Sequence, residues 1–334
     1  MSAAVDTGRV ERTALSDSVA RWVRRNTWTL GLFGLLVSIL VLTKLIQPSY
    51  GADALQGLAI GALPLAMAAV AQAIVVISGG IDLSVGSMMA FTSVTAAVLM
   101  KGQSEEFAVA VVFGVLAMGV VLGIVNGSLV VITRVPDIVV TLAMSFVWAG
   151  CALLVLNTPG GGSAQWLKDL VTGSIGSEWT PRALITLIVI VGVVWIPLRR
   201  STLGLALYAI GSSRLAAFRS GVSVGRTKIL AYALTGLFSA FGGLALTAST
   251  GIGSPVPGAY TLLGIAAIVL GGVSLAGGRG GLVGPIVAVF VLALVRTDLT
   301  LLNVNSNLAT VIQGMILIGV VMFGSLVAMR RTRT

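Results

Sequence analysis

The chain has 334 residues, of which 57% are hydrophobic and 10% are charged, and its formal net charge is +10. Soluble globular domains average about 45–50% apolar and about 25% charged residues, so this composition indicates an integral membrane protein. The chain has one cysteine and no histidine, which excludes a disulfide framework, a histidine-based catalytic triad and the usual zinc sites. We therefore expect no catalytic residues, no metal and no cofactor.

Residues 1–27 are polar and rich in arginine, with acidic residues interspersed and no small-residue cleavage site after the apolar run that follows. These features are not those of a signal peptide. They predict an N-terminal tail on the cytoplasmic side, and residues 329–334 predict a second cytoplasmic tail.

Between the two tails, the apolar residues fall in blocks of about 17–25, the length that a helix needs to cross a bilayer. The blocks predict an all-α, polytopic membrane bundle with about ten transmembrane helices, forming one transmembrane domain over residues 28–328. The third and ninth blocks are short and begin in glycine-rich sequence, which suits re-entrant or broken helices. The predicted spans are Trp28–Ile46, Ala54–Ile77, Val85–Met100, Phe107–Ile132, Asp137–Leu156, Arg182–Leu198, Ile229–Thr250, Ala259–Ala276, Leu282–Arg296 and Ser306–Ala328.

The basic residues favour one orientation of this bundle. An even number of spans puts both termini on one side, and 16 of the 21 lysines and arginines then lie on that side. The positive-inside rule makes that side cytoplasmic. Because the arginines flank apolar runs and do not share one soluble face, the charge does not indicate nucleic-acid binding.

Two loops stand out. Residues 157–181 form a predicted outer loop with Trp166 and Trp179, which suits either a membrane-surface anchor or a docking ledge for an extracytoplasmic partner. Residues 199–228 form an inner loop in which Ser212 or Ser213 is placed to cap a short helix that runs from Arg214 to Ser220, with Gly221 after its end. Leu215 and Phe218 share one face of that helix, although an ordinary connecting loop is the alternative.

Polar groups inside the apolar regions are the candidate functional residues. Asp82 is a carboxylate within the segment Ile77-Ser-Gly-Gly-Ile-Asp-Leu-Ser-Val-Gly-Ser87, where it either caps the next helix and shapes a gate or contacts a solute. Gly119, Gly123 and Gly127 predict a smooth stripe for close helix packing. The other candidates for the translocation path and gate are Gln72, Ser84, Ser93, Asn126 and Gln313, each of which could instead be a helix–helix hydrogen bond.

Three segments together resemble the permease subunits of bacterial ribose-type ABC sugar importers. They are residues 79–87 around Asp82, residues 207–222 from Leu-Tyr-Ala-Ile-Gly to Ser-Gly-Val, and residues 266–280 from Ala-Ala-Ile-Val-Leu to Gly-Gly-Arg-Gly. The likeness covers nearly all of the chain from the second span onward. The chain departs from the pattern at Arg214, where relatives carry polar or acidic residues, and at Asp137, where they carry an aromatic one.

This resemblance implies a permease that moves a monosaccharide, such as a ribose-like pentose, across the bacterial inner membrane by alternating access. It implies as partners cytoplasmic ABC ATPases, an extracytoplasmic sugar-binding protein and a second permease copy, identical or not, besides membrane lipid. The absence of a Gly-Lys P-loop agrees with a separate ATPase. The residues implied to couple to that ATPase are Arg214, Leu215, Ala216, Ala217, Phe218, Ser220 and Gly221.

Three alternatives stay open at the level of the sequence. The transported solute could be a nucleoside or an amino acid. The chain could be an ion-coupled secondary carrier that uses Asp82 or Asp137 as its ion site, although no internal repeat is evident. An enzyme embedded in the membrane is disfavoured because no paired acids or activated nucleophile appear.

Overall fold

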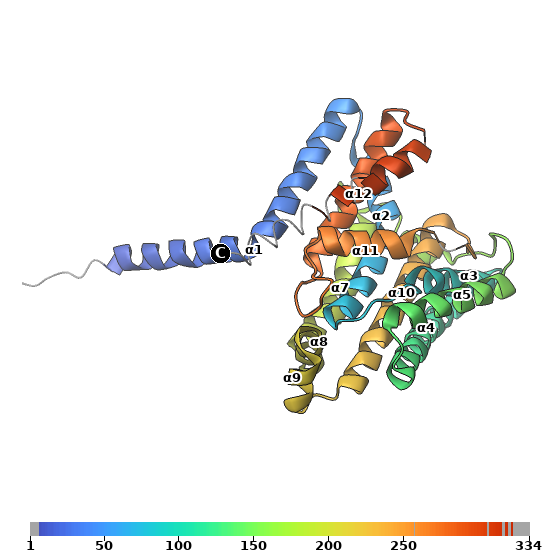
Figure 1. Cartoon of the computed structure of the whole chain (residues 1–334). Helices are drawn as coiled ribbons and strands as arrows, with labels where there is room; N and C mark the ends of the chain where they lie inside the picture. The colour runs from blue at the N-terminus through green and yellow to red at the C-terminus, as the bar shows by residue number, and fades with distance from the viewer. Residues whose placement is uncertain (1–6, 257, 306, 316–317, 320–321, 323–334) are drawn as a thin grey trace, which may run out of the picture.

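The computed structural model describes residues 7–256, 258–305, 307–315, 318–319 and 322, with side chains from residue 27 onward. The described residues form a bundle of helices with one two-stranded hairpin (Figure 1), so the predicted all-α polytopic membrane fold is confirmed. In chain order the elements are α1 (Thr7–Ile46), α2 (Ala52–Ile77), α3 (Val85–Met100), α4 (Glu105–Thr133), α5 (Asp137–Val155), α6 (Gln165–Asp169), β1 (Ser174–Ile175), β2 (Ser177–Pro181), α7 (Arg182–Arg200), α8 (Thr202–Ser212), α9 (Arg214–Arg219), α10 (Val224–Thr250), α11 (Tyr260–Leu270) and α12 (Val283–Leu301).

Seven of the described helices are long and apolar enough to cross a membrane. They are the Thr27–Ile46 part of α1 together with α2, α4, α5, α7, α10 and α12, and they correspond to seven of the predicted spans. The ninth predicted span, α12, is one continuous helix of 19 residues. Of the possibilities left open for this span, a broken helix is therefore excluded.

Two predicted spans are shorter than a full crossing in the described structure. α3 has the predicted bounds, but its 16 residues rise only about 24 Å, less than the roughly 30 Å hydrocarbon core. α11 ends at Leu270 and not near Ala276, because Gly272 takes a left-handed backbone and a Cβ on Gly271 would lie 2.6 Å from the Cα of Pro285. Of the tenth predicted span, Ser306–Ala328, the structure describes residues 307–315, 318–319 and 322, all of them helical, and the rest lies outside the described residues.

The core of the bundle lies around α2 and α10. Most of α2 is buried inside the protein, whereas only a minority of the residues of α5 and α7 are buried. α10 packs against α2, α3 and α4. Its closest approach is to α4, where a Cβ on Gly123 would lie 2.8 Å from the backbone carbonyl carbon of Tyr232. The predicted glycine stripe on α4 therefore does serve a neighbouring helix.

The two predicted loops both contain more structure than expected. The inner loop holds α8 as well as α9. The expected cap of α9 is confirmed, since the Ser213 side chain accepts a hydrogen bond from the backbone N–H of Ala216, and Gly221 follows with φ of 82°. The outer loop holds the short helix α6 and the β1–β2 hairpin, neither of which has a strong local sequence pattern.

α8 and α9 lie together at one end of the bundle (Figure 1). We call it the basic end, because five arginines belong to these helices, to the end of α7 and to the start of α10. They are Arg199, Arg200, Arg214, Arg219 and Arg226.

Candidate functional site

Asp82 lies in the loop of residues 78–84 that joins α2 to α3, and it is fully buried. Its Oδ1 accepts hydrogen bonds from the backbone N–H of Ser84 at 2.8 Å and from the Ser84 hydroxyl at 2.6 Å. Among the described residues, Oδ2 has no hydrogen-bond partner. The carboxyl group therefore closes the turn that starts α3, where Ser84 is the N-cap residue.

Four of the predicted path residues come together around this turn. The Gln72 side-chain amide donates to the Asp82 backbone carbonyl at 2.6 Å, and the Asn126 amide donates to the Ser84 hydroxyl at 2.7 Å. The Asn126 carbonyl oxygen then accepts from the indole N–H of Trp148 at 3.1 Å. α2, α4 and α5 are thus tied to the loop by one buried polar chain.

Two predicted path residues are not part of this chain. The Ser93 hydroxyl, further along α3, bonds the Thr247 hydroxyl of α10 at 2.9 Å. Gln313 is half-buried in the helical residues 307–315. Trp148 was not among the predicted residues, although an indole inside an apolar span needs an acceptor and could have indicated a polar partner.

A buried ion pair holds the same loop from the side. Lys228 Nζ of α10 lies 2.6 Å from Asp137 Oδ1 at the start of α5, with the two side chains only 7% and 13% exposed. The Tyr232 hydroxyl lies 2.9 Å from Asp137 Oδ2 and 3.1 Å from the Ile81 carbonyl oxygen, and it donates to one of them at a time. The Thr141 hydroxyl accepts from the Leu83 N–H at 3.0 Å.

The three segments that carry the family resemblance meet at the basic end. The N–H of Gly278 donates to the Ile77 carbonyl at 2.9 Å. The backbones pack so closely there that a Cβ on Gly211 would clash with the Ile77 carbonyl and lie 2.6 Å from the Gly278 nitrogen. A Cβ on Gly277 would lie 2.9 Å from the Gly79 Cα. We call this contact of Gly79, Gly211, Gly277 and Gly278 the glycine junction.

Two side chains of α8 and α9 extend the glycine junction. The Arg214 guanidinium donates to the Gly79 carbonyl at 3.2 Å, and the Tyr208 hydroxyl donates to the Gly280 carbonyl at 2.8 Å. Burial raises the pKa of Tyr208 above its ordinary value, so its hydroxyl stays protonated and available as a donor. α8 and α9 are thereby joined to the Asp82 loop and to the loop that follows α11.

The face of α9 that points away from the glycine junction is open. Leu215 and Phe218 are 60% and 69% exposed. Ala216, Ser220 and Gly221 are also exposed, and Ala217 is buried beneath the helix. Six of the seven predicted coupling residues are therefore exposed, as is the basic residue Arg219.

The described residues offer no cluster of three or more side chains that could hold a metal ion. The site instead joins a buried polar turn, an ion pair and a backbone junction to an exposed surface helix. Such an arrangement suits the transmission of movement between a surface and a membrane interior rather than bond chemistry.

Known proteins are similar in sequence to this chain over most of its length. Residues 54–321 match the family described as branched-chain amino acid transport system, permease component. The ribose import permease protein RbsC of Escherichia coli K12 is 34% identical over 259 residues, which cover 76% of this chain and 79% of RbsC. RbsC of Bacillus subtilis is 33% identical over 293 residues, covering 86% and 89% of the two chains.

A relative of different printed specificity matches even more of the chain. The autoinducer 2 import system permease protein LsrD of Salmonella typhimurium is 28% identical over 323 residues, covering 92% of this chain and 94% of LsrD. No solved structure matches the chain. The family match and these relatives show that the chain belongs to the family of permease subunits of ribose-type ABC importers, proteins of the inner membrane that cross it several times.

Proposed function

We propose that this chain is the membrane-spanning subunit of an ABC importer that carries a monosaccharide or a similar small polar solute inward by alternating access. The observation that supports this most directly is the glycine junction, which joins the exposed helix α9 to the buried Asp82 loop. ATP hydrolysis belongs to a separate subunit, since this chain has no P-loop.

The basic end is the cytoplasmic end in this proposal, and both termini are cytoplasmic. The positive-inside rule supports this orientation, since the arginines of α7, α8, α9 and α10 gather there. The exposed Leu215 and Phe218 would enter an apolar groove of the ATPase, with Arg214 and Arg219 at its margin. Exposed apolar side chains that lie together indicate a partner surface.

Movement of α9 would reach the solute path through backbone contacts. Because Gly211 and Gly79 touch without side chains between them, a displacement of α8 and α9 cannot be absorbed by rotamer changes. It shifts the Asp82 loop and with it the start of α3. The four residues of the buried polar turn are fully buried in this structure; they are Asp82, Ser84, Gln72 and Asn126. In the proposal they shape the closed gate of this conformation, and they line the solute path only in a different conformation of the transporter.

The class of solute is inferred from the relatives. Two of them are ribose import permeases and a third is an autoinducer 2 import permease, which supports a ribose-like pentose or a related simple sugar over a nucleoside or an amino acid. A weak internal site with a few hydrogen-bonding groups suits release of the solute into the cell. The sugar would be delivered by an extracytoplasmic binding protein, and a second permease copy would complete the path.

Co-purification tests the ATPase contact. The tagged chain is purified from its own membrane in mild detergent, and we expect a P-loop ATPase to remain attached. Phe218→Ala should release the ATPase, whereas Phe113→Ala should not, because Phe113 is exposed to the same degree but lies within the span α4. Equal ATPase recovery with both variants would contradict the proposed docking surface.

Reconstitution tests the energy source. Vesicles that hold the complex should take up ribose only with ATP and the sugar-binding protein present. The ion-coupled alternative predicts uptake by the chain alone, driven by a sodium or proton gradient and lost in Asp137→Asn. Such uptake would refute the importer proposal.

A further inference from the structure

A cavity of about 650 Å³ lies at the end of the bundle opposite the basic end. Its inner wall is formed by Leu63 and Met67 of α2 and by Phe241 and Leu244 of α10, all of them apolar. α7 and the segment from α6 to β1 form the other walls. Pockets of about 300–1,000 Å³ are large enough to bury a good part of a small ligand.

The mouth of this cavity faces the surroundings of the protein at membrane depth. Val189 lines the cavity and is also 54% exposed, on a helix that exposes Ile188 and Val193 as well. Leu170 and Ile175 likewise line the cavity and are about half exposed. A groove bounded by exposed apolar side chains on a transmembrane helix is open to the acyl chains of the bilayer.

Two charged residues, Arg182 and Asp169, border the cavity. Arg182 is the first residue of α7, and its guanidinium is fixed by two backbone carbonyls, those of Ser174 at 3.1 Å and Asp169 at 2.9 Å. Among the described residues, Arg182 forms no ion pair. The Asp169 carboxylate also borders the cavity, but it accepts a hydrogen bond from the Gln165 side chain at 2.9 Å.

An aromatic residue places this part of the cavity at the level of the lipid headgroups. Trp166 lines the cavity, and its indole N–H donates to the Glu105 carbonyl at 3.1 Å. Tryptophan is enriched at this level because its ring is apolar and its N–H is polar. The arginine therefore stands where phosphate groups lie, and the apolar walls extend from it toward the membrane centre.

We propose that this cavity binds a phospholipid from the leaflet on the Arg182 side, with one acyl chain inside and the phosphate paired with Arg182. Water does not fill an apolar cavity favourably, and an empty one would forfeit dispersion contacts along its whole wall. Guanidinium groups match phosphate geometry well. Retained lipid would hold α7 against α2 and α10.

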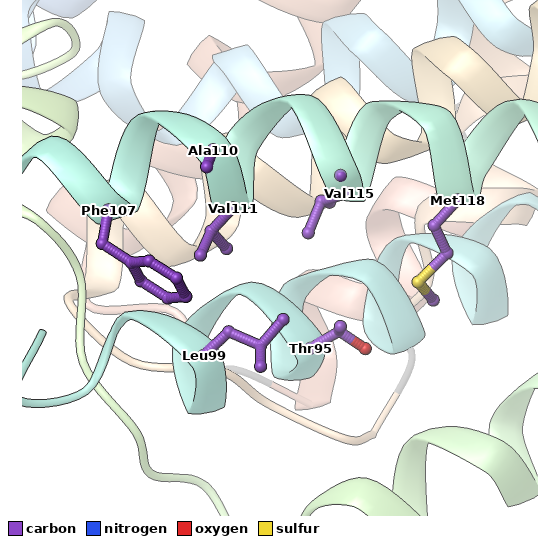
Figure 2. Close-up of a pocket in the computed structure, with 8 residues that line it drawn as sticks. Thr95, Leu99, Phe107, Ala110, Val111, Val115 and Met118 are labelled. Carbon is purple, nitrogen blue, oxygen red and sulfur yellow. The ribbon is translucent and has the colours of Figure 1, made fainter.

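A second cavity in the same protein provides an internal control. It measures about 400 Å³ and lies between α3 and α4, where Thr95, Leu99, Phe107, Val111 and Met118 line it (Figure 2). None of its lining residues is charged. It could accept hydrocarbon but offers no group that would select a phosphate.

Native mass spectrometry of the full complex in detergent tests the proposal, with phosphatidylglycerol as the probe and diacylglycerol of the same chains as the comparison. The wild-type complex should retain phosphatidylglycerol in preference to diacylglycerol. Arg182→Gln should reduce that preference on the order of tenfold, the effect of losing one charge-assisted contact. Unchanged preference in Arg182→Gln would overturn the proposed phosphate contact.

Filling the cavity tests the place of the acyl chain. Ala245→Trp should abolish retention of both lipids, and Leu99→Trp, which fills the control cavity, should leave the preference unchanged. If Ala245→Trp does not accumulate, Ala248→Leu on the same wall serves instead. Wild-type retention in Ala245→Trp or Ala248→Leu would overturn the proposal, and so would a wild-type complex that retains no phospholipid because another protein chain covers the mouth.

Discussion

The ion pair of Asp137 and Lys228 predicts how the free energy of unfolding should change when either residue or both are replaced. It is the one ion pair among the described residues, and both side chains are nearly buried. Removing one member of a buried pair costs about 3–5 kcal/mol, because the remaining charge is left without compensation. Replacing both by apolar residues avoids that cost.

The structure predicts different costs for the two single changes. In Lys228→Met, the Asp137 carboxylate keeps the Tyr232 hydroxyl and the N-terminus of α5, so the loss should be near about 3 kcal/mol. In Asp137→Leu, Lys228 keeps no partner that the described residues show, so the loss should be near about 5 kcal/mol. The double variant should lie within about 1–2 kcal/mol of wild type, since apolar replacement of a buried pair is often neutral.

Equilibrium unfolding in mixed micelles measures the three free energies. The singles and the double together give a coupling energy, which should reach about 6 kcal/mol, because losses of about 3 and about 5 kcal/mol would add to about 8 and the double should lose no more than about 2. If the losses of the two single variants simply add in the double variant, with a coupling below about 0.5 kcal/mol, the reasoning is refuted. The pair would then be solvated in the folded protein.

Three further predictions follow from the close contacts. Gly211→Ala should abolish transport but leave ATPase co-purification intact, because the added methyl separates α8 from Ile77 while the face of α9 is unchanged. Asp82→Asn should accumulate in the membrane like wild type, since its oxygen still accepts from the turn, whereas Asp82→Ala should lose about 1–3 kcal/mol and accumulate less on an immunoblot. Gly123→Ala should lower the unfolding free energy by about 1–3 kcal/mol, and Gly114→Ala on the same helix, where a Cβ meets nothing within 4 Å, should not lower it.

Hydropathy was sufficient to predict the spans whose boundaries depend on local sequence. α3 has the predicted bounds. The Ser213 cap and the Gly221 end of α9 could be predicted because capping depends on only a few neighbouring residues. α11 was predicted too long because its end depends on a close approach to the start of α12. A glycine pair in the sequence indicates that the backbone is free to turn, but it does not say what the backbone meets.

The side-chain pairings inside the bundle could not be predicted from the sequence for a related reason. Asn126 and Trp148 are 22 residues apart, and Asp137 and Lys228 are 91 apart. Each of these side chains is a polar group that needs a hydrogen-bonding or charged partner, and the sequence offers several residues that could be that partner. Only the helix packing selects among them.

The departure at Asp137 shows how such a selection operates. A carboxylate at this position is costly in a membrane protein unless a cation faces it, and Lys228 of α10 does. The pair also positions the Tyr232 hydroxyl near the Ile81 carbonyl, next to Asp82. The Asp82 loop is therefore held by several helices, among them α9 through Arg214, α10 through Tyr232 and α4 through Asn126. A loop held in this way moves only when its supports move, so a displacement of α9 relative to α10 is the movement that would reset the start of α3.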